Sequence, residues 1–164
     1  TRLTFNGNKS ITALSSFLQR FKSLTILELR FFDLEPGLLP TLDLPRLCAL
    51  ELKSCGFVLT PENQAALLKM NQIEILELSD NPLGALFDLS LLPMLTSIDL
   101  SLTGINEPPP RLLDLPELHI AVLRDNFITE LPQAIFKLPD SHSLALFSRV
   151  FTRFWHLSTA FVRP

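Results

Sequence analysis

Leucine and other apolar residues recur along the chain in one pattern, Leu-x-x-Leu-x-Leu-x-x-Asn/Cys-x-Leu. Five copies begin at positions 24, 47, 73, 95 and 118, so successive copies are 23, 26, 22 and 23 residues apart. Leu3, Phe5 and Asn8 form an incomplete earlier copy. A period of about 20 to 29 residues is typical of a leucine-rich repeat. The pattern predicts an α/β fold, a leucine-rich-repeat solenoid of about five to six repeats over residues 1–139, with a curved parallel sheet.

Each position of the pattern has an expected structural role. The Leu-x-Leu pair places alternate side chains inward from a short strand, and the Asn/Cys position satisfies backbone groups where the strand turns. The residues at that position are, in order, Asn8, Phe32, Cys55, Asn81, Thr103 and Asn126. We expect the asparagines to be structural, Cys55 and Thr103 to be smaller substitutes, and Phe32 to weaken its turn.

The segments that return from one strand to the next are short and rich in Leu-Pro pairs, where proline needs no ladder donor. The longest repeat differs, because Thr60 suits a helix cap, Pro61 the first helical position and Glu62 the first turn. This segment predicts a helix over residues 61–70 that packs Leu67 and Leu68 inward.

Composition narrows the classes of function. The chain has 164 residues, 47% of them hydrophobic, which favours one folded domain with a sizeable core. A net charge of −3 leaves no broad cationic surface for phosphates, so nucleic acid is not an expected partner. The two cysteines, Cys48 and Cys55, lie on one extended segment roughly 20 Å apart, too far to bridge, so free thiols are expected.

The polar positions of the predicted strands supply the candidate binding site. The middle residue of each Leu-x-Leu pair should face the concave side, and four neighbouring strands place a carboxylate there. These are Glu28, Glu51, Glu77 and Asp99. Two residues further along each strand, Arg30 and Lys53 provide basic neighbours for the first two strands, whereas Ser79 and Ser101 do not for the others.

Two interpretations of this column stay open. It is either a solvated, partly self-paired charged face or an acidic strip, centred on Glu77, Asp80 and Asp99, that binds a basic patch on a protein partner. Apolar side chains beside the strip, Phe31 and Leu102 among them, serve either as anchors for that partner or as packing between strands. The other members of this apolar set are Ile26, Ile75 and Ile120.

No motif in the sequence predicts catalysis, a metal or a cofactor. His119, His142 and His156 have no cysteine or carboxylate at ligand spacing. The chain also contains no glycine-rich phosphate loop, no G-x-S-x-G elbow and no H-E-x-x-H motif. We therefore expect a protein-binding module and no enzymatic activity in this chain. Two alternatives stay open: a non-catalytic piece of an enzyme whose activity resides outside this chain, or a truncated remnant with no retained activity.

The composition changes after residue 139. Residues 140–164 form an aromatic, basic tail in which Leu144, Phe147, Phe151 and Phe154 fall near helical spacing. Three alternatives remain for it: a helix that caps the open end of the solenoid, a segment that contacts a membrane surface or a partner helix, or a non-native end. Arginines in its middle argue against a helix that spans a membrane.

Several segments of the repeat region resemble a known family. NKSITALSSFLQRF, VLTPENQAALLKMNQIEILELSDNPLG and RDNFITELPQAIFKLP are similar to the leucine-rich-repeat region of bacterial effector-type proteins that carry a novel ubiquitin-protein ligase (NEL) domain. The resemblance implies that the repeats select a substrate, that a downstream domain carries the catalytic cysteine, and that the protein is secreted into the host cell cytoplasm. The Cys-x-Asp context of that cysteine is absent at Cys48 and Cys55, so no catalytic residue carries over.

Overall fold

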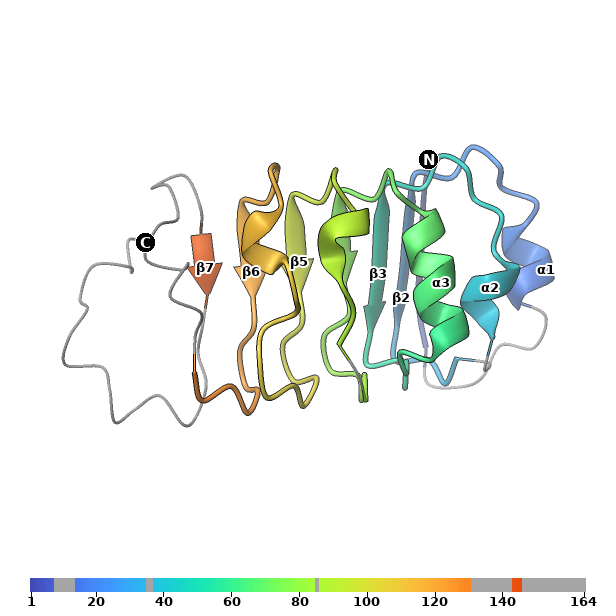
Figure 1. Ribbon diagram of the computed structural model, residues 1–164. Helices are drawn as coiled ribbons and strands as arrows, with labels where there is room; N and C mark the ends of the chain where they lie inside the picture. Colours follow the sequence, from blue (N-terminus) through green and yellow to red (C-terminus); the bar gives the residue numbers. More distant parts are fainter. Residues whose placement is uncertain (8–13, 35–36, 85, 131–142, 146–164) are drawn as a thin grey trace.

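The computed structural model of the protein describes residues 1–7, 14–34, 37–84, 86–130 and 143–145. Its strands form one sheet in which each strand lies beside the next strand of the sequence, in the order β1-β2-β3-β4-β5-β6-β7. All neighbouring pairs are parallel. The chain therefore has an α/β fold with a single open parallel sheet (Figure 1), which confirms this part of the predicted fold class.

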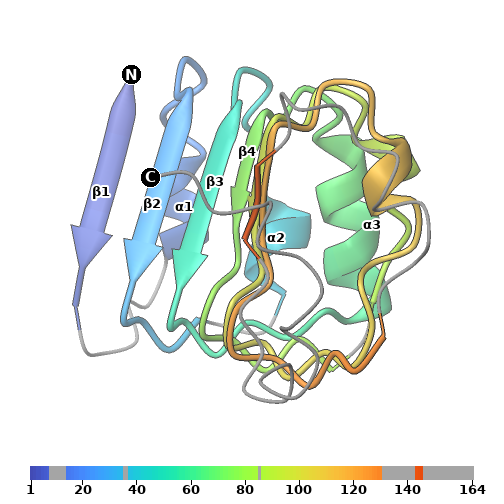
Figure 2. The ribbon, with the colours of Figure 1, turned by 90° about the vertical axis from the view of Figure 1, so that its left-hand side faces the viewer.

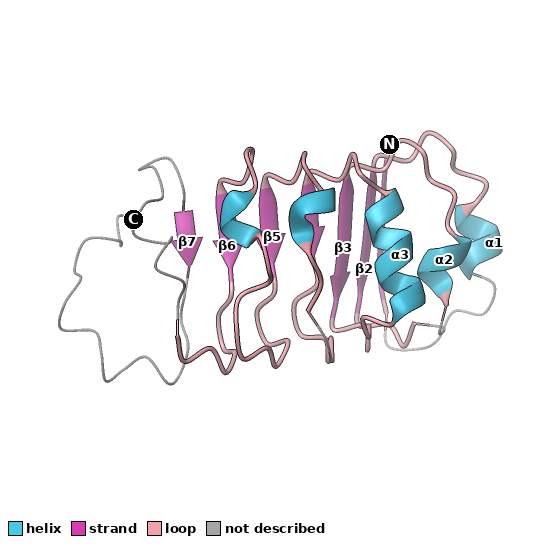
Figure 3. Ribbon diagram, in the orientation of Figure 1, coloured by secondary structure: helices cyan, strands magenta, loops and turns pink. Residues whose placement is uncertain are grey.

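Strands and short helical turns alternate along the chain. The strands are β1 (Arg2–Asn6), β2 (Ile26–Arg30), β3 (Ala49–Lys53), β4 (Ile75–Glu77), β5 (Ser97–Asp99), β6 (Ile120–Val122) and β7 (Ser143–Ala145). The helical elements are α1 (Leu14–Leu18), α2 (Leu38–Thr41), α3 (Pro61–Lys69), η1 (Leu89–Leu91) and η2 (Leu112–Asp114). The helices all lie on one side of the sheet (Figures 2 and 3), so its other side has no helix over it among the described elements.

The Leu-x-Leu pairs of the sequence pattern form the buried side of the strands. Leu27 and Leu29 of β2 are fully buried and lie in register with Leu50 and Leu52 of β3. Successive side chains of a strand point to opposite faces, so these leucines share the core face. On the other face of β2, Ile26 and Arg30 are partly exposed and Glu28 is buried. The core therefore lies between the sheet and the return segments, as the pattern predicted.

The predicted helix over residues 61–70 is confirmed as α3. The Thr60 hydroxyl accepts a hydrogen bond of 3.2 Å from the Asn63 backbone N–H, and Pro61 occupies the first helical position. Leu67 is fully buried, whereas Leu68 is only partly buried against the core. The extra residues of the longest repeat thus build the longest helix of the described residues.

Asparagine side chains tie neighbouring repeats together. Asn81 Oδ1 accepts hydrogen bonds from the backbone N–H groups of Cys55 and Phe57, both at 2.9 Å. Asn81 Nδ2 donates to the backbone carbonyls of Leu52 at 2.6 Å and Leu78 at 2.9 Å. Asn126 repeats this arrangement two repeats later, where its Oδ1 accepts from Thr103 N and Ile105 N and its Nδ2 donates to Leu100 O and Leu123 O. This geometry fits the structural role expected for the asparagines.

Smaller residues at the same position reproduce part of this bonding. The Cys55 thiol lies 3.2 Å from the Leu29 carbonyl, and the Thr103 hydroxyl donates to the Leu100 carbonyl at 2.7 Å. Phe32 has no polar group to offer, but its ring is buried and lies 2.8 Å from the point where a Cβ on Gly7 would stand. Packing of the ring on Gly7 takes the place of hydrogen bonds at this turn. The corresponding position in the first copy, Asn8, lies outside the described residues.

Five residues with left-handed backbone conformation follow the strands at the same place in successive repeats. They are Phe31, Ser54, Asp80, Leu102 and Asp125, with φ between 52° and 58°. In the first four of these residues the backbone N–H bonds to the next repeat, as in Phe31 N to Lys53 O at 3.0 Å and Leu102 N to Arg124 O at 2.9 Å. Strands β2 to β6 are therefore each followed by a sharp turn that stays in phase with its neighbours.

The sheet extends into the segment assigned to the C-terminal tail. Strand β7 pairs with β6 and places Leu144 in register with Ala121. The helical pattern predicted from Leu144 onward is therefore wrong for Ser143–Ala145, and the sheet continues past the boundary expected at residue 139. The physical reason is that β6 leaves a row of backbone donors and acceptors at the sheet edge, which an added strand satisfies. The rest of the tail lies outside the described residues.

Candidate functional site

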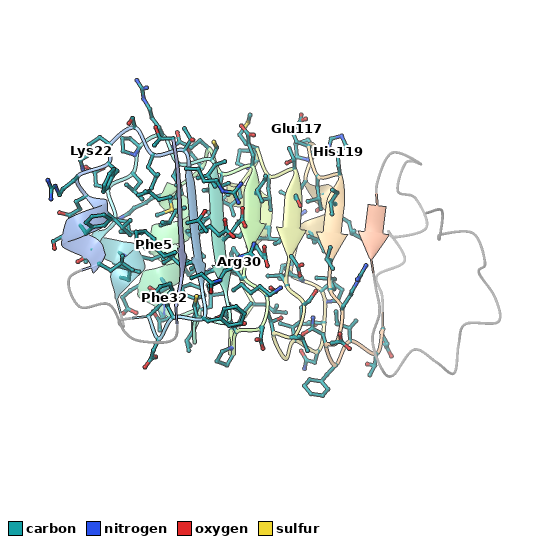
Figure 4. All side chains as sticks on the ribbon, turned by 180° about the vertical axis from the view of Figure 1, so that it is seen from behind. Phe5, Lys22, Arg30, Phe32, Glu117 and His119 are labelled. Atoms are coloured by element: carbon teal, nitrogen blue, oxygen red, sulfur yellow. The ribbon has the colours of Figure 1, made fainter. Side chains whose placement is uncertain are left out.

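The candidate site lies on the side of the sheet away from the helices, which we call the open face. It is formed by the first, third and fifth residues of the longer strands, whose second and fourth residues point into the core. Figure 4 views the molecule from this side, with Arg30 projecting over the strands. The open face thus presents columns of side chains that run across the sheet, one residue from each strand.

The four predicted carboxylates form one column in the order expected. Glu28 lies in register with Glu51, Glu51 with Glu77, and Glu77 with Asp99. Strands in a sheet lie about 4.8 Å apart, so these carboxylates are close enough to repel one another unless cations intervene. The structure therefore brings together Glu28, Glu51, Glu77 and Asp99, and their ionic partners decide what each can do.

Two arginines neutralise the first half of this column. Arg2 Nη2 lies 2.6 Å from Glu28 Oε2 and 4.0 Å from Glu51 Oε1. Arg30 Nε lies 2.5 Å from Glu28 Oε1, and its Nη2 lies 3.6 Å from Glu51 Oε2. The Arg30 N–H is not directed at the oxygen, so this contact is an ion pair without a hydrogen bond. The Thr4 hydroxyl adds a 2.9 Å hydrogen bond to Glu28.

Arg2 is a partner that the sequence pattern did not reveal. Arg30 was expected as a basic neighbour, and Lys53 was expected beside it. Among the described residues Lys53 forms no ion pair within 4.0 Å, whereas Arg2 reaches two carboxylates from the edge strand. The repeat pattern could have indicated this role of Arg2, because it places Arg2 in register with Ile26 on the open face.

Glu28 and Glu51 respond to this environment in opposite ways. The hydrogen bond from Arg2 lowers the pKa of Glu28; burial acts against it, and Thr4 and Arg30 lower the pKa further. Burial raises the pKa of Glu51, as do the charges of Glu28 and Glu77, and the two arginines only partly offset them.

These opposite shifts have opposite consequences for stability. The lowered pKa means that ionised Glu28 stabilises the fold above its unfolded value of about 4.3, a contribution that is lost as the pH falls through the folded pKa. The raised pKa means that ionised Glu51 costs folding free energy at neutral pH, a cost that disappears as the pH falls through its folded pKa.

The second half of the column has no cation within ion-pair distance among the described residues. Glu77 Oε1 accepts a hydrogen bond of 2.9 Å from the Ser79 hydroxyl. Asp99 Oδ1 accepts from the Ser101 backbone N–H at 2.8 Å and from its hydroxyl at 2.6 Å. Within the described part of the chain neither carboxylate has a basic group within 4.0 Å, and only one oxygen of each is used in these bonds. Glu77 and Asp99 therefore each keep an acceptor oxygen on the open face that no described residue engages.

The remaining predicted site residues lie at the ends of the strands. Asp80 is exposed and accepts a 2.6 Å hydrogen bond from the Ser54 hydroxyl. Phe31 and Leu102 are each 52% exposed. Two strands separate them, a spacing of roughly 14 Å at the usual strand separation. The structure thus does not bring Phe31 and Leu102 into one apolar anchor, although each remains accessible singly.

On the open face, the apolar residues Ile75 and Ile120 flank the small residue Ser97. Ile75 is 41% exposed and Ile120 is 45% exposed, and both lie in register with Ser97 of the strand between them. The pattern had placed the two isoleucines on this face but had not singled out Ser97. The sequence could have indicated this arrangement, because Ser97 is small and the isoleucines in register with it on both neighbouring strands are large.

The described residues were also searched for a metal site, a membrane-spanning helix and reactive thiols. No group of three histidine, cysteine or acidic side chains there is arranged to hold a metal ion. No helix among them is long and apolar enough to cross a membrane. Cys48 and Cys55 are both free thiols, and burial raises the pKa of Cys55. The environment of Cys55 therefore disfavours its thiolate form.

The chain was compared with known proteins. It matches no protein-family model, and no curated protein matches it.

Proposed function

We propose that the chain is a leucine-rich-repeat solenoid that binds a protein partner on the open face of its sheet. The periodic sequence pattern and the parallel strands in sequence order both support the solenoid. In such a stack each unit contacts only its neighbours, and the extended sheet face serves as the binding surface.

One observation carries the binding role. The open face combines exposed large apolar side chains, Ile75 and Ile120, with two carboxylates, Glu77 and Asp99, that pair with no cation in the described part of the chain. Exposed apolar groups beside polar ones are typical of protein interfaces, where aliphatic and aromatic anchors supply affinity and charge supplies selectivity. The half of the face near β2 is less suited, because its carboxylates are already paired with arginines.

A capture experiment with matched variants tests this role. The wild-type chain and two double variants, Ile75→Asp with Ile120→Asp on the open face and Leu91→Asp with Met94→Asp on a return segment, are immobilised and exposed to cell lysate. Leu91 and Met94 are 56% and 49% exposed, so the second variant adds the same charges at equally accessible apolar positions.

The expected result is a set of proteins that the wild type and the return-segment variant retain and the open-face variant loses. Equal retention by all three proteins, or selective loss by the return-segment variant, would refute binding through the open face. Thermal melting of each variant shows whether it is folded before it is used.

A role as the substrate-recognition arm of a ubiquitin-protein ligase follows from the resemblance of the repeats alone. On this proposal the chain itself has no catalytic role, and the ligase activity would reside in sequence outside it. Ubiquitin transfer by the native full-length protein, with and without these repeats, tests that extension.

A further inference from the structure

We propose that the open face binds a single lysine or arginine side chain of its partner over Ser97, with the aliphatic stem between Ile75 and Ile120 and the cation on Asp99 and Glu77. This inference rests on the proposed function and names the chemistry that the face selects.

The apolar part of the site comes from three residues in one column. Ile75, Ser97 and Ile120 lie in register on β4, β5 and β6. Adjacent strands are about 4.8 Å apart, so the two isoleucines stand roughly 10 Å apart with only a serine side chain between them. That separation matches the width of one unbranched aliphatic chain in van der Waals contact with both sides.

The charged part lies next to it along the same strands. Asp99 follows Ser97 by two residues on β5, and Glu77 follows Ile75 by two residues on β4. Residues two apart on a strand are separated by about 7 Å, which the four-carbon stem of a lysine or the longer arginine side chain spans. A side chain lying along β5 therefore reaches from the isoleucines to the carboxylates.

Free acceptor atoms make the carboxylates competent to bind a cation. Their hydrogen bonds to serine engage Oε1 of Glu77 and Oδ1 of Asp99, which leaves Oε2 and Oδ2 without a partner among the described residues. The serine bonds also hold both carboxylates in place, so little conformational freedom is lost on binding. Two such oxygens on adjacent strands suit the several N–H donors of an ammonium or guanidinium group.

A neighbouring position of similar composition lacks the features that the Ser97 position combines. Ala49 stands between Ile26 and Ile75 in the same column, and Glu51 follows it on β3. Ala49 is only 3% exposed, however, and Glu51 already lies 3.6 Å from Arg30. A lysine or arginine side chain of a partner could therefore not reach the buried Ala49, and the Glu51 carboxylate there is already near Arg30.

Peptide selection on the full chain tests the inference without knowledge of the natural partner. A phage library of random twelve-residue peptides is selected on the wild-type protein, and enriched peptides are then measured against variants. Asp99→Asn with Glu77→Gln removes the charges and keeps the shape, and Ser97→Leu fills the position between the isoleucines. Ser97→Ala and Glu51→Gln are the matched controls, and thermal melting verifies that every variant folds.

The expected outcome is enrichment of peptides that contain lysine or arginine and bind the first two variants at least about tenfold more weakly, the equivalent of about 1.4 kcal/mol, with the controls unchanged. Replacement of the critical basic residue by norleucine in such a peptide should produce the same loss. This result would assign the cation site to Ser97 and its neighbours.

Two other outcomes separate this inference from the proposed function. Peptides that lose binding on Ile75→Asp with Ile120→Asp, but have no basic residue in common, would overturn the cation site and leave the open face as a binding surface. Failure to enrich any peptide, or enrichment of peptides that are indifferent to every open-face variant, would count against both.

Discussion

Replacement of Asn81 by alanine should destabilise the protein more than its size suggests. The Asn81 side chain is 1% exposed and bonds only to backbone groups, in its own repeat and in the repeat before it. Alanine would leave the N–H groups of Cys55 and Phe57 and the carbonyls of Leu52 and Leu78 without this partner. Each unsatisfied buried polar group costs about 1 to 3 kcal/mol, and partial relaxation reduces the sum.

We therefore expect Asn81→Ala to lower the free energy of unfolding by about 3 kcal/mol. In a domain of this size each kcal/mol shifts the melting temperature by roughly 3 °C, so the expected shift is roughly 9 °C. Circular dichroism during thermal melting measures it, and urea titration gives the free energy. Asn81→Thr should lose less, because the Thr103 hydroxyl at the equivalent position donates a 2.7 Å hydrogen bond to the Leu100 carbonyl.

Asn71→Ala is the matched control, since Asn71 is exposed and lies in the return segment ten residues before Asn81. It should melt within about 1 °C of the wild type, the range of neutral surface substitutions. If Asn81→Ala also melted within that range, the side chain would not be bridging the two repeats, and the account of the asparagine position would be refuted.

Three further predictions follow from the same geometry. Glu51→Gln should raise the stability at pH 7, because the raised pKa of Glu51 marks a charged form that disfavours folding, and the gain should vanish in urea titrations below about pH 4, where the carboxyl is protonated. Leu102→Asn should stabilise by about 1 kcal/mol, because asparagine tolerates a φ of 57° better than leucine and little burial is lost; a lower urea midpoint would contradict this. Gly7→Ala should destabilise, because its Cβ would stand 2.8 Å from the Phe32 ring, and Phe32→Leu should relieve part of that loss in a double-mutant cycle; purely additive effects would refute the contact.

The strands and their register were predictable from the sequence. A period-2 alternation of apolar and polar residues specifies which side chains face the core, and the constant spacing of the copies specifies which residues of adjacent strands meet. For this reason Glu28, Glu51, Glu77 and Asp99 lie in one column as predicted. The N-terminal cap of α3 was also predictable, because Thr60, Pro61 and Glu62 are neighbours in sequence and act within one helical turn.

The C-terminal strand was missed for a physical reason. Leu144 has helical spacing to later aromatic residues, but it also continues the repeat, 23 residues after Ala121. Local spacing cannot decide between the two, whereas the exposed backbone groups of β6 favour a strand. The packing of the Phe32 ring on Gly7 could not be predicted from the sequence either. The contact joins residues one repeat apart and is visible only in the folded structure.

The sequence by itself determined the periodic strands, the face on which each side chain lies and the column of carboxylates, since these depend on local alternation and a constant spacing. Only the tertiary structure decided which carboxylates keep their charge free for a partner. Arg2 and Arg30 pair with Glu28 and reach towards Glu51, while the described residues give Glu77 and Asp99 serine hydrogen bonds and no ion pair. These ion pairs depend on the distances between long side chains of different strands, and the sequence pattern does not specify those distances.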